Sequence, residues 1–191
     1  ALPISNSRLM KFVKLIGGER EGQKIKNRRC EAIDDDEVVT YYSFLSLIVI
    51  VLGRFRKTKQ LSVWLDRKIA DLFGRKVAKL AISEQADGVL CFSMNERTCF
   101  QYLSKHAPSI KRMVDCANSP INFMKFVYES DMAVNGMKYL KQEAPRYWKK
   151  KTLKRELIGL NYTQYFFAPS NFVRKGLLWS GVQRSEERRV G

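Results

Sequence analysis

The middle of the chain reads as a strand, a helix and a second strand in close succession. Residues 86–93, ADGVLCFS, form a short and nearly continuous apolar run, which is typical of a strand covered on both faces. A helical stretch follows in residues 97–106, and residues 110–116, IKRMVDC, form the second apolar run. Two strands joined by one helix run parallel, so the pattern predicts a βαβ unit. We expect an α/β fold, a Rossmann-like parallel sheet with flanking helices.

The same arrangement returns near the end of the chain. Residues 164–170, QYFFAPS, are another candidate for a buried strand, followed by a helical pattern that stops at Gly181. Ser93 also ends a strand, and its spacing from Glu96 is that of a capping box. Because α/β sheets bind ligands at the carboxyl ends of their strands, we expect Ser93 and Ser170 at that edge. Helix capping alone is the competing interpretation for both serines.

The first part of the chain, residues 1–84, is basic and, from Glu37 onward, helical in pattern. The run 44–53, FLSLIVIVLG, is about half as long as a membrane span, so we interpret it as a core helix or strand. Residues 64–83 carry apolar side chains at three- and four-residue steps, which predicts a helix with one buried face. The expected buried positions are Trp64, Leu65, Ile69, Leu72, Phe73, Val77, Leu80 and Ala81. Residues 85–183 then form the βαβ part of the domain.

The formal net charge of +16 predicts an anionic partner, which could be nucleic acid, acidic lipid or a phosphorylated substrate. Two stretches, RFRKTK at 54–59 and RYWKKKTLKR at 146–155, interleave basic and aromatic residues. On a peripheral enzyme these stretches would dock on an anionic membrane surface. The candidate membrane-contact residues are Arg54, Arg56, Lys57, Lys149, Lys150 and Lys151. A solvated helix face is the competing interpretation.

The cysteines give no sign of a metal site. No two of Cys30, Cys91, Cys99 and Cys116 have the CxxC spacing, and His106 is the only histidine, so we predict no zinc site. Cys91 and Cys116 lie in or beside apolar runs, where a cysteine acts as a small buried hydrophobic residue. This use of cysteine fits a reduced, cytoplasmic compartment.

Residues 141–182 contain short motifs in a fixed order. They are Glu143 and Pro145, the KREL of Lys154 to Leu157, an apolar strand ending in Pro169-Ser170, then Phe172, Val173 and Gly181-Val182. This order resembles the end of the N-terminal domain of retaining glycosyltransferases of family four, which have the two-domain GT-B fold. Residues 86–120 are similar to an earlier part of that domain, with a strand, an acceptor-side helix and a strand that ends in an acid.

The chain departs from this family pattern at two places. The family usually has Ala-Asp before the last strand, whereas this chain has Asn161-Tyr162. Many members carry a histidine in the loop that corresponds to residues 117–123, but this loop reads ANSPINF. No role for that histidine is therefore carried over, and the catalytic residues remain unassigned.

The resemblance implies transfer of a sugar from a nucleotide-sugar donor to a sugar or lipid-linked acceptor, which this domain would mainly hold. The donor-binding domain would lie beyond Gln183, so we expect the chain to be inactive by itself and to bind no cofactor. In such an enzyme the loops after the strands line the cleft, and small hydroxyls and amides suit sugar hydroxyls. The candidate acceptor-binding residues are Ser93, Asn95, Asn118, Ser119 and Ser170.

The last eight residues, 184–191, read RSEERRVG, which matches the translation of DNA resembling a common sequencing-library adaptor. We interpret this tail as an artefact and exclude it from the fold. The natural chain is then expected to continue past Gln183.

Three other classes of protein were weighed against the glycosyltransferase. A small basic nucleic-acid-binding domain fits the charge, but no helix-turn-helix, zinc-finger or RNA-stacking motif accompanies it. Another Rossmann-like enzyme, such as a dehydrogenase or methyltransferase, would carry GxGxxG after a strand, and none is present. A serine hydrolase lacks support because neither Ser93 nor Ser170 lies in GxSxG.

Overall fold

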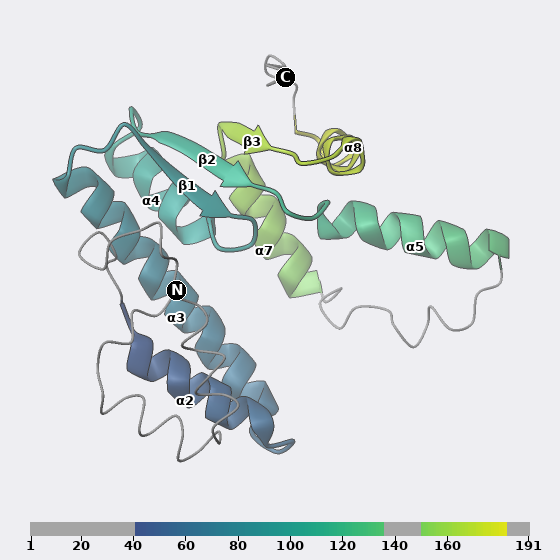
Figure 1. The fold of residues 1–191 in the computed structure, drawn as a ribbon, viewed down its shortest axis with the longest axis horizontal. Coiled ribbons are helices and arrows are strands. Elements are labelled where there is room, and N and C mark those ends of the chain that lie inside the picture. The colour runs from purple at the N-terminus through teal and green to yellow at the C-terminus, as the bar shows by residue number, and fades with distance from the viewer. Residues whose placement is uncertain (1–40, 136–149, 183–191) are drawn as a thin grey trace, which may run out of the picture. The chain divides into compact units, whose positions relative to one another are not determined.

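The computed structural model describes residues 41–135 and 150–182 (Figure 1). The chain divides into two compact units, Ala1–Ile69 and Ala70–Gly191. The helix α3 (Lys59–Ser83) crosses the boundary between them. The cysteine Cys30, the lysine Lys149, the motif at Glu143 and Pro145, and the tail 184–191 lie outside the described residues.

In the first unit, α2 (Ser43–Arg54) and the beginning of α3 form a helical hairpin. The Thr58 hydroxyl donates to the Leu52 carbonyl oxygen at 2.6 Å, and the Ser62 hydroxyl donates to that of Val49 at 2.9 Å. These two bonds hold the turn between the helices. The predicted helix over the FLSLIVIVLG run is confirmed. The expectation of a core helix fails for its described side chains, however, because none of them is buried and Leu45 and Ile50 are exposed.

The second unit is built on a parallel sheet of three strands in the order β1-β2-β3. They are β1 (Gly88–Phe92), β2 (Lys111–Asp115) and β3 (Tyr165–Phe167). Helix α4 (Arg97–His106) joins β1 to β2, α5 (Ile121–Asn135) and α7 (Lys150–Asn161) lie between β2 and β3, and α8 (Asn171–Trp179) follows β3. The predicted βαβ unit and the Rossmann-like, parallel α/β architecture are confirmed.

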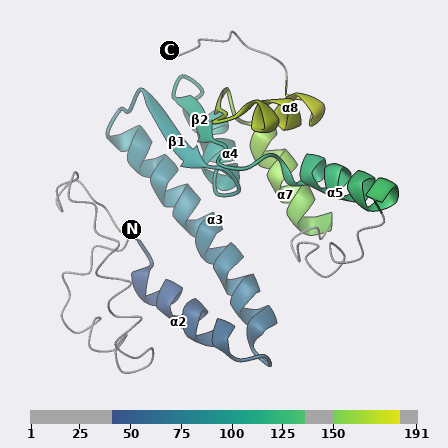
Figure 2. The same cartoon turned by 45° about the vertical axis from the view of Figure 1, so that its right-hand side comes forward.

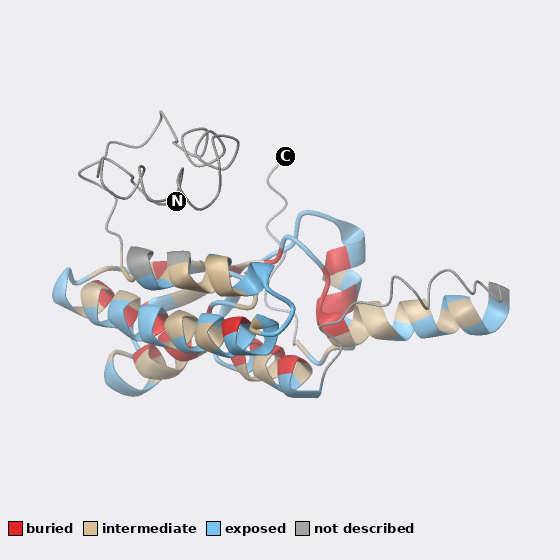
Figure 3. Ribbon diagram, turned by 90° about the horizontal axis from the view of Figure 1, so that it is seen from below, coloured by how far each residue is buried: buried red, intermediate tan, exposed pale blue. Residues whose placement is uncertain are grey.

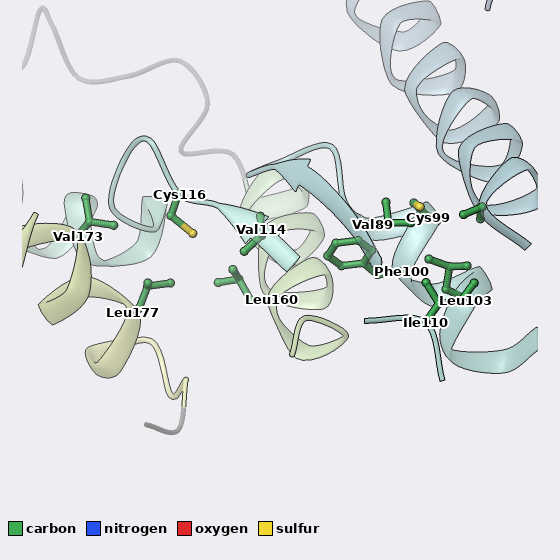
Figure 4. Close-up of a cluster of buried hydrophobic side chains, with 12 residues drawn as sticks. Val89, Cys99, Phe100, Leu103, Ile110, Val114, Cys116, Leu160, Val173 and Leu177 are labelled. Carbon is green, nitrogen blue, oxygen red and sulfur yellow. The ribbon is translucent and has the colours of Figure 1, made fainter. Parts of the chain in front are cut away.

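One face of this sheet carries the core. Successive residues of a strand point to opposite faces, so Val89 of β1 and Val114 of β2 lie on the same side. They are buried with Phe100 and Leu103 of α4 and Leu160 of α7 (Figure 4). Every second side chain of β1 and β2 therefore points to the face that α4 and α7 cover.

The opposite face of the sheet is exposed among the described residues. Leu90 and Phe92 of β1 are 59% and 67% exposed, and Tyr165 and Phe167 of β3 are 47% and 52% exposed. The prediction that these strands are covered on both faces is therefore wrong for the described part of the chain. The apolar runs are real, but α4 and α7 pack against only every second side chain.

The long helix α3 is also less buried than its sequence pattern predicts. Ala81 is buried, and Leu65, Ile69, Val77 and Leu80 are half-buried. Trp64, Leu72 and Phe73 are exposed instead. Helix α5 is similarly exposed to solvent, since none of its described residues after Ile121 is buried (Figure 3). Among the described helices, none is both long enough and apolar enough to cross a membrane.

Both ends of α8 follow the predicted signals. Ser170 is the N-cap, and its hydroxyl accepts a hydrogen bond from the Val173 backbone N–H at 3.3 Å. At the other end Gly181 has a φ of 87°, the left-handed conformation that glycine adopts most easily. The Val182 and Gly181 amides donate to the carbonyl oxygens of Leu177 and Leu178, which together form a Schellman motif.

Candidate functional site at the carboxyl edge of the sheet

The loops that follow β1, β2 and β3 meet at one edge of the sheet because the three strands are parallel (Figures 1 and 2). All five candidate acceptor-binding residues lie in these loops or at their ends. Asn95, Asn118 and Ser170 are exposed, and Ser93 is half-buried. Ser119 is the exception, because it is 3% exposed. The topology thus places four of the five predicted residues where a ligand at this edge could reach them.

The predicted capping box at the start of α4 is wrong. The Ser93 backbone N–H donates to the Asp115 carbonyl oxygen at 3.0 Å and so extends the ladder between β1 and β2. Met94 has a φ of 80°, and the Asn95 amide closes the turn by donating to the Phe92 carbonyl oxygen. The N-cap of α4 is Glu96, whose side chain makes no capping bond. The tight turn at Met94 therefore directs Glu96 away from solvent.

The Glu96 carboxylate lies in the interior with 0% exposure, and neither oxygen has a hydrogen-bond partner among the described residues. Burial raises its pKa, although the nearby amides of Glu96 itself, Met94 and Asn95 and the charge of Arg155 lower it in part. A methyl group at Gly159 of α7 would collide with its Oε1 atom. Only a glycine fits against this carboxylate, so Glu96 and α7 are closely matched.

A second buried carboxylate comes from α7. Glu156 is 4% exposed, and its Oε2 atom accepts a hydrogen bond from the Ile121 backbone N–H at 2.9 Å. Glu156 therefore satisfies a free amide at the beginning of α5. Burial raises the pKa of Glu156 to about 7, and the charge of Glu96 acts in the same direction. We call Glu96 and Glu156 the buried acid pair.

Two of the cysteines near this pair, Cys99 and Cys116, are inert thiols. Burial raises the pKa of Cys116 to about 12, and the charges of Glu96, Asp115 and Glu156 add to the effect. The pKa of Cys99 is also raised, by its hydrogen bond with Cys91 and by burial. Because a thiolate is the reactive form, Cys116 and Cys99 are not nucleophiles at neutral pH. All three cysteines in the described segments are free, and the prediction that Cys116 is a small buried residue is confirmed.

Ser119 belongs to the packing of α5 against α8. Its hydroxyl oxygen is buried without a partner among the described residues, and a methyl group at Gly176 of α8 would collide with it. Phe123 of α5 contacts the rings of Phe172 and Trp179, so α5 and α8 lie side by side (Figure 2). The prediction that Ser119 faces a cleft is therefore wrong, because α8 covers it.

A cluster of ion pairs braces the helices behind the site. Asp71 of α3 accepts hydrogen bonds from Arg97 at 2.8 Å, from Arg155 at 2.6 Å and from the Thr98 hydroxyl at 2.6 Å. Burial alone would raise the pKa of Asp71, but the bonds from Arg155, Thr98 and Arg97 hold it at about 2. We call these four residues the Asp71 cluster. It joins α3, α4 and α7 and so fixes the two helices that carry the buried acid pair.

The sequence patterns missed the buried acid pair and the Asp71 cluster. Glu96 was interpreted as one half of a capping box, and Glu156 was noted only as part of the KREL motif. One signal was available, because an isolated glycine such as Gly159 in a helix usually has a packing reason. The neighbour that approaches could not be named from the pattern, since Glu96 comes from a distant part of the chain.

The exposed groups at this edge can form neutral hydrogen bonds. Asn95 and Asn118 offer both donors and acceptors, and Ser170 adds a hydroxyl that already serves as a cap. Beneath them the carboxylates of the buried acid pair are 0% and 4% exposed, so they support the loops rather than reach a ligand. No group of three or more His, Cys, Asp or Glu side chains in the described ranges could hold a metal ion.

The predicted membrane-contact residues lie in both units. Arg54, Arg56 and Lys57 are exposed at the turn of the hairpin in the first unit. Lys150 and Lys151 are exposed at the beginning of α7 in the second. Comparisons of the chain with protein-family models, with curated proteins and with solved structures gave no match.

Proposed function

We propose that this chain is the acceptor-binding, N-terminal domain of a GT-B glycosyltransferase. The complete enzyme would transfer a sugar from a nucleotide-sugar donor to an acceptor held at the carboxyl edge of this sheet. The observation that carries the proposal is the placement of Asn95, Asn118 and Ser170, three exposed polar residues, at the ends of three neighbouring parallel strands. Ligands of open α/β sheets bind at this edge.

The order of local structures around α8 also supports the proposal. The resemblance to the family rests partly on Pro169-Ser170 and on Gly181-Val182. Ser170 caps α8, and Gly181 with Val182 ends it in a Schellman motif. These residues therefore serve a definite physical purpose in a strand-to-helix unit, and the same unit would be needed in a GT-B domain.

The proposal assigns the rest of the reaction to sequence outside these residues. A second, C-terminal domain would bind the nucleotide-sugar donor and supply the catalytic groups, so the chain alone would bind acceptor without turnover. We propose a cytoplasmic location with peripheral contact to a membrane, which would suit a lipid-linked acceptor. Lys150 and Lys151 would take part in that contact through their charge.

Acceptor binding is tested by saturation-transfer difference NMR of the chain with a panel of free monosaccharides and a water-soluble short-chain diacylglycerol. The double variant N95A/N118A should weaken binding of the responding compound about thirtyfold, since each of the two lost hydrogen bonds is worth about 1 kcal/mol. The matched control is N161A, because Asn161 is an exposed asparagine just before β3 and therefore lies at the opposite edge of the sheet. Equal effects of the two variants, or no binding at all, would count against the acceptor site.

The reading frame offers a second test. The uninterrupted source DNA should continue past Gln183 into another Rossmann-like domain with a pair of glutamates on a strand-to-helix loop. Nucleotide-sugar assays on that longer protein would then identify the donor. A stop codon directly after Gln183 would overturn the donor-dependent reaction. Strong binding of short DNA or RNA that weakens steeply with salt would then favour the nucleic-acid-binding alternative.

A further inference from the structure

The turn of the α2–α3 hairpin gathers exposed apolar and basic side chains in the first unit. We call this set the hairpin patch. Its apolar members are Phe55, Leu61 and Trp64, and its basic members are Arg54, Arg56, Lys57, Lys59 and Lys68.

The apolar members of the patch are large and well exposed. Phe55 at the turn is 60% exposed, Trp64 is 55% exposed and Leu61 is 48% exposed. Leu61, Trp64 and Lys68 are spaced by three and four residues, so they share one face of α3. Apolar side chains rimmed by polar ones mark interaction surfaces. The turn that presents them is held by the bonds of Thr58 and Ser62 to α2.

The charge around the turn of the hairpin is positive, and the first acidic residue after the turn is the exposed Asp66 of α3. Residues 41–65 contain Arg54, Arg56, Lys57 and Lys59 and no aspartate or glutamate. The Lys68 Nζ atom lies 5.8 Å from the centre of the Trp64 ring, so a further positive charge sits beside the exposed indole. The occupant of this surface must therefore accept apolar groups and carry negative charge.

We propose that the hairpin patch docks the protein on an anionic lipid bilayer. Tryptophan and phenylalanine partition to the headgroup level of a membrane, and leucine enters the acyl boundary beneath it. Lysine and arginine near the surface each strengthen binding about fivefold through the negative surface potential. A nucleic acid would also attract the charges and could stack on the two aromatic rings. It would leave the exposed Leu61 without an apolar partner.

The test is co-sedimentation of the full chain with extruded vesicles. One set contains phosphatidylcholine alone, and the other contains about one third phosphatidylserine, which mimics an anionic leaflet. The chain should bind the anionic vesicles at low salt and much less at about 0.5 M salt, where charges are screened. It should bind the neutral vesicles weakly at both.

Two variants separate the parts of the patch. R54Q/R56Q/K57Q should weaken binding to the anionic vesicles by about a hundredfold, from three losses of about fivefold each. F55S/W64S should lower binding even where the charges are kept, because the apolar insertion is lost. The matched control is R75Q/K76Q/K79Q, which removes the same charge from exposed positions of α3 outside the patch. Circular dichroism verifies that each variant keeps its helices.

Three results would overturn the proposal. The chain could fail to bind anionic vesicles at low salt. The control variant could lose as much binding as R54Q/R56Q/K57Q, which would mean that net charge alone attracts the lipid. The hairpin variants could weaken binding to a short duplex or single strand of DNA while leaving vesicle binding unchanged, which would assign the patch to nucleic acid. None of these results bears on the acceptor site, because Asn95 and Asn118 belong to the other unit.

Discussion

The carboxyl edge of the sheet and the α2–α3 hairpin differ in which side chains they bury and which they expose. At the edge, the carboxylates Glu96 and Glu156 are buried beneath the loops and enclosed by packed helices. At the hairpin, Phe55 and Trp64 are exposed beside lysine and arginine. The first region buries carboxylates, which is unfavourable unless the helices around them pack closely. The second region exposes large apolar side chains, which is unfavourable unless a partner covers them. Substitutions should therefore change folding at the edge and binding at the hairpin.

The largest expected effect comes from replacing glycine in each region. G159A places a methyl group against the Glu96 carboxylate, which is buried and has no free space to enter. We expect the free energy of unfolding to fall by about 3 kcal/mol, the upper end for overpacking. G53A is the counterpart in the hairpin, where the added methyl would lie 3.2 Å from the Ser62 hydroxyl, a contact that a shift of a few tenths of an ångström relieves. Urea denaturation should give G53A a free energy of unfolding within about 1 kcal/mol of that of the parent. Equal losses of stability in G159A and G53A would contradict the difference between the two regions.

The next effect is a dependence of stability on pH. The pKa of Glu156 is raised from 4.5 to about 7. Its contribution to the free energy of unfolding is therefore fully present below pH 4.5 and is lost as pH rises through 7. The free energy of unfolding should fall over that interval by about 3 kcal/mol. E156Q keeps an acceptor for the Ile121 amide and should flatten most of this slope, leaving the part due to Glu96. An unchanged slope in E156Q would show that the pair does not titrate as described.

A smaller effect of opposite sign belongs to the Asp71 cluster. The pKa of Asp71 is lowered from 3.8 to about 2, so its contribution is present above pH 3.8 and is lost as pH falls through 2. D71N leaves Arg97 and Arg155 without their shared carboxylate. We expect a loss of about 2 kcal/mol at neutral pH, less than for a fully buried pair because Asp71 is partly exposed. Thermal unfolding of D71N at neutral pH measures this loss of stability. A decrease of the melting temperature by less than about one degree would show that the Asp71 cluster does not stabilise the fold.

The smallest effect concerns the turn that buries Glu96. Met94 has a φ of 80°, which costs a non-glycine residue of this kind about 1 kcal/mol. M94G should therefore raise the free energy of unfolding by up to about 1 kcal/mol. K76G is a suitable contrast, since Lys76 is an exposed residue in the interior of α3, where glycine should destabilise by a similar amount. Destabilisation by both variants would mean that the turn at Met94 is not strained.

Local signals in the sequence were enough for the sheet and for α8. The apolar runs before Ser93 and Ser170 identified two of the strands, and Ser170 and Gly181 marked the two ends of α8, because caps and stops depend on nearby residues. The burial of Glu96 could not be predicted in the same way. Ser93 and Glu96 match a capping box in sequence, and the outcome is decided by the backbone at Met94 and by Gly159 on a distant helix. Pairings between distant segments also decide which face of the sheet is covered.

The exposed face of the sheet has a consequence for how this protein behaves in concentrated solution. Among the described residues, β1 and β3 each pair only with β2, so each has an outer edge of unpaired backbone groups. Beside these edges lie Leu90, Phe92 and Phe167, which are exposed and apolar. An open edge beside an apolar face is a template on which another strand can add. Self-association through such a template grows with protein concentration, so dilution is the condition that would keep the protein monomeric.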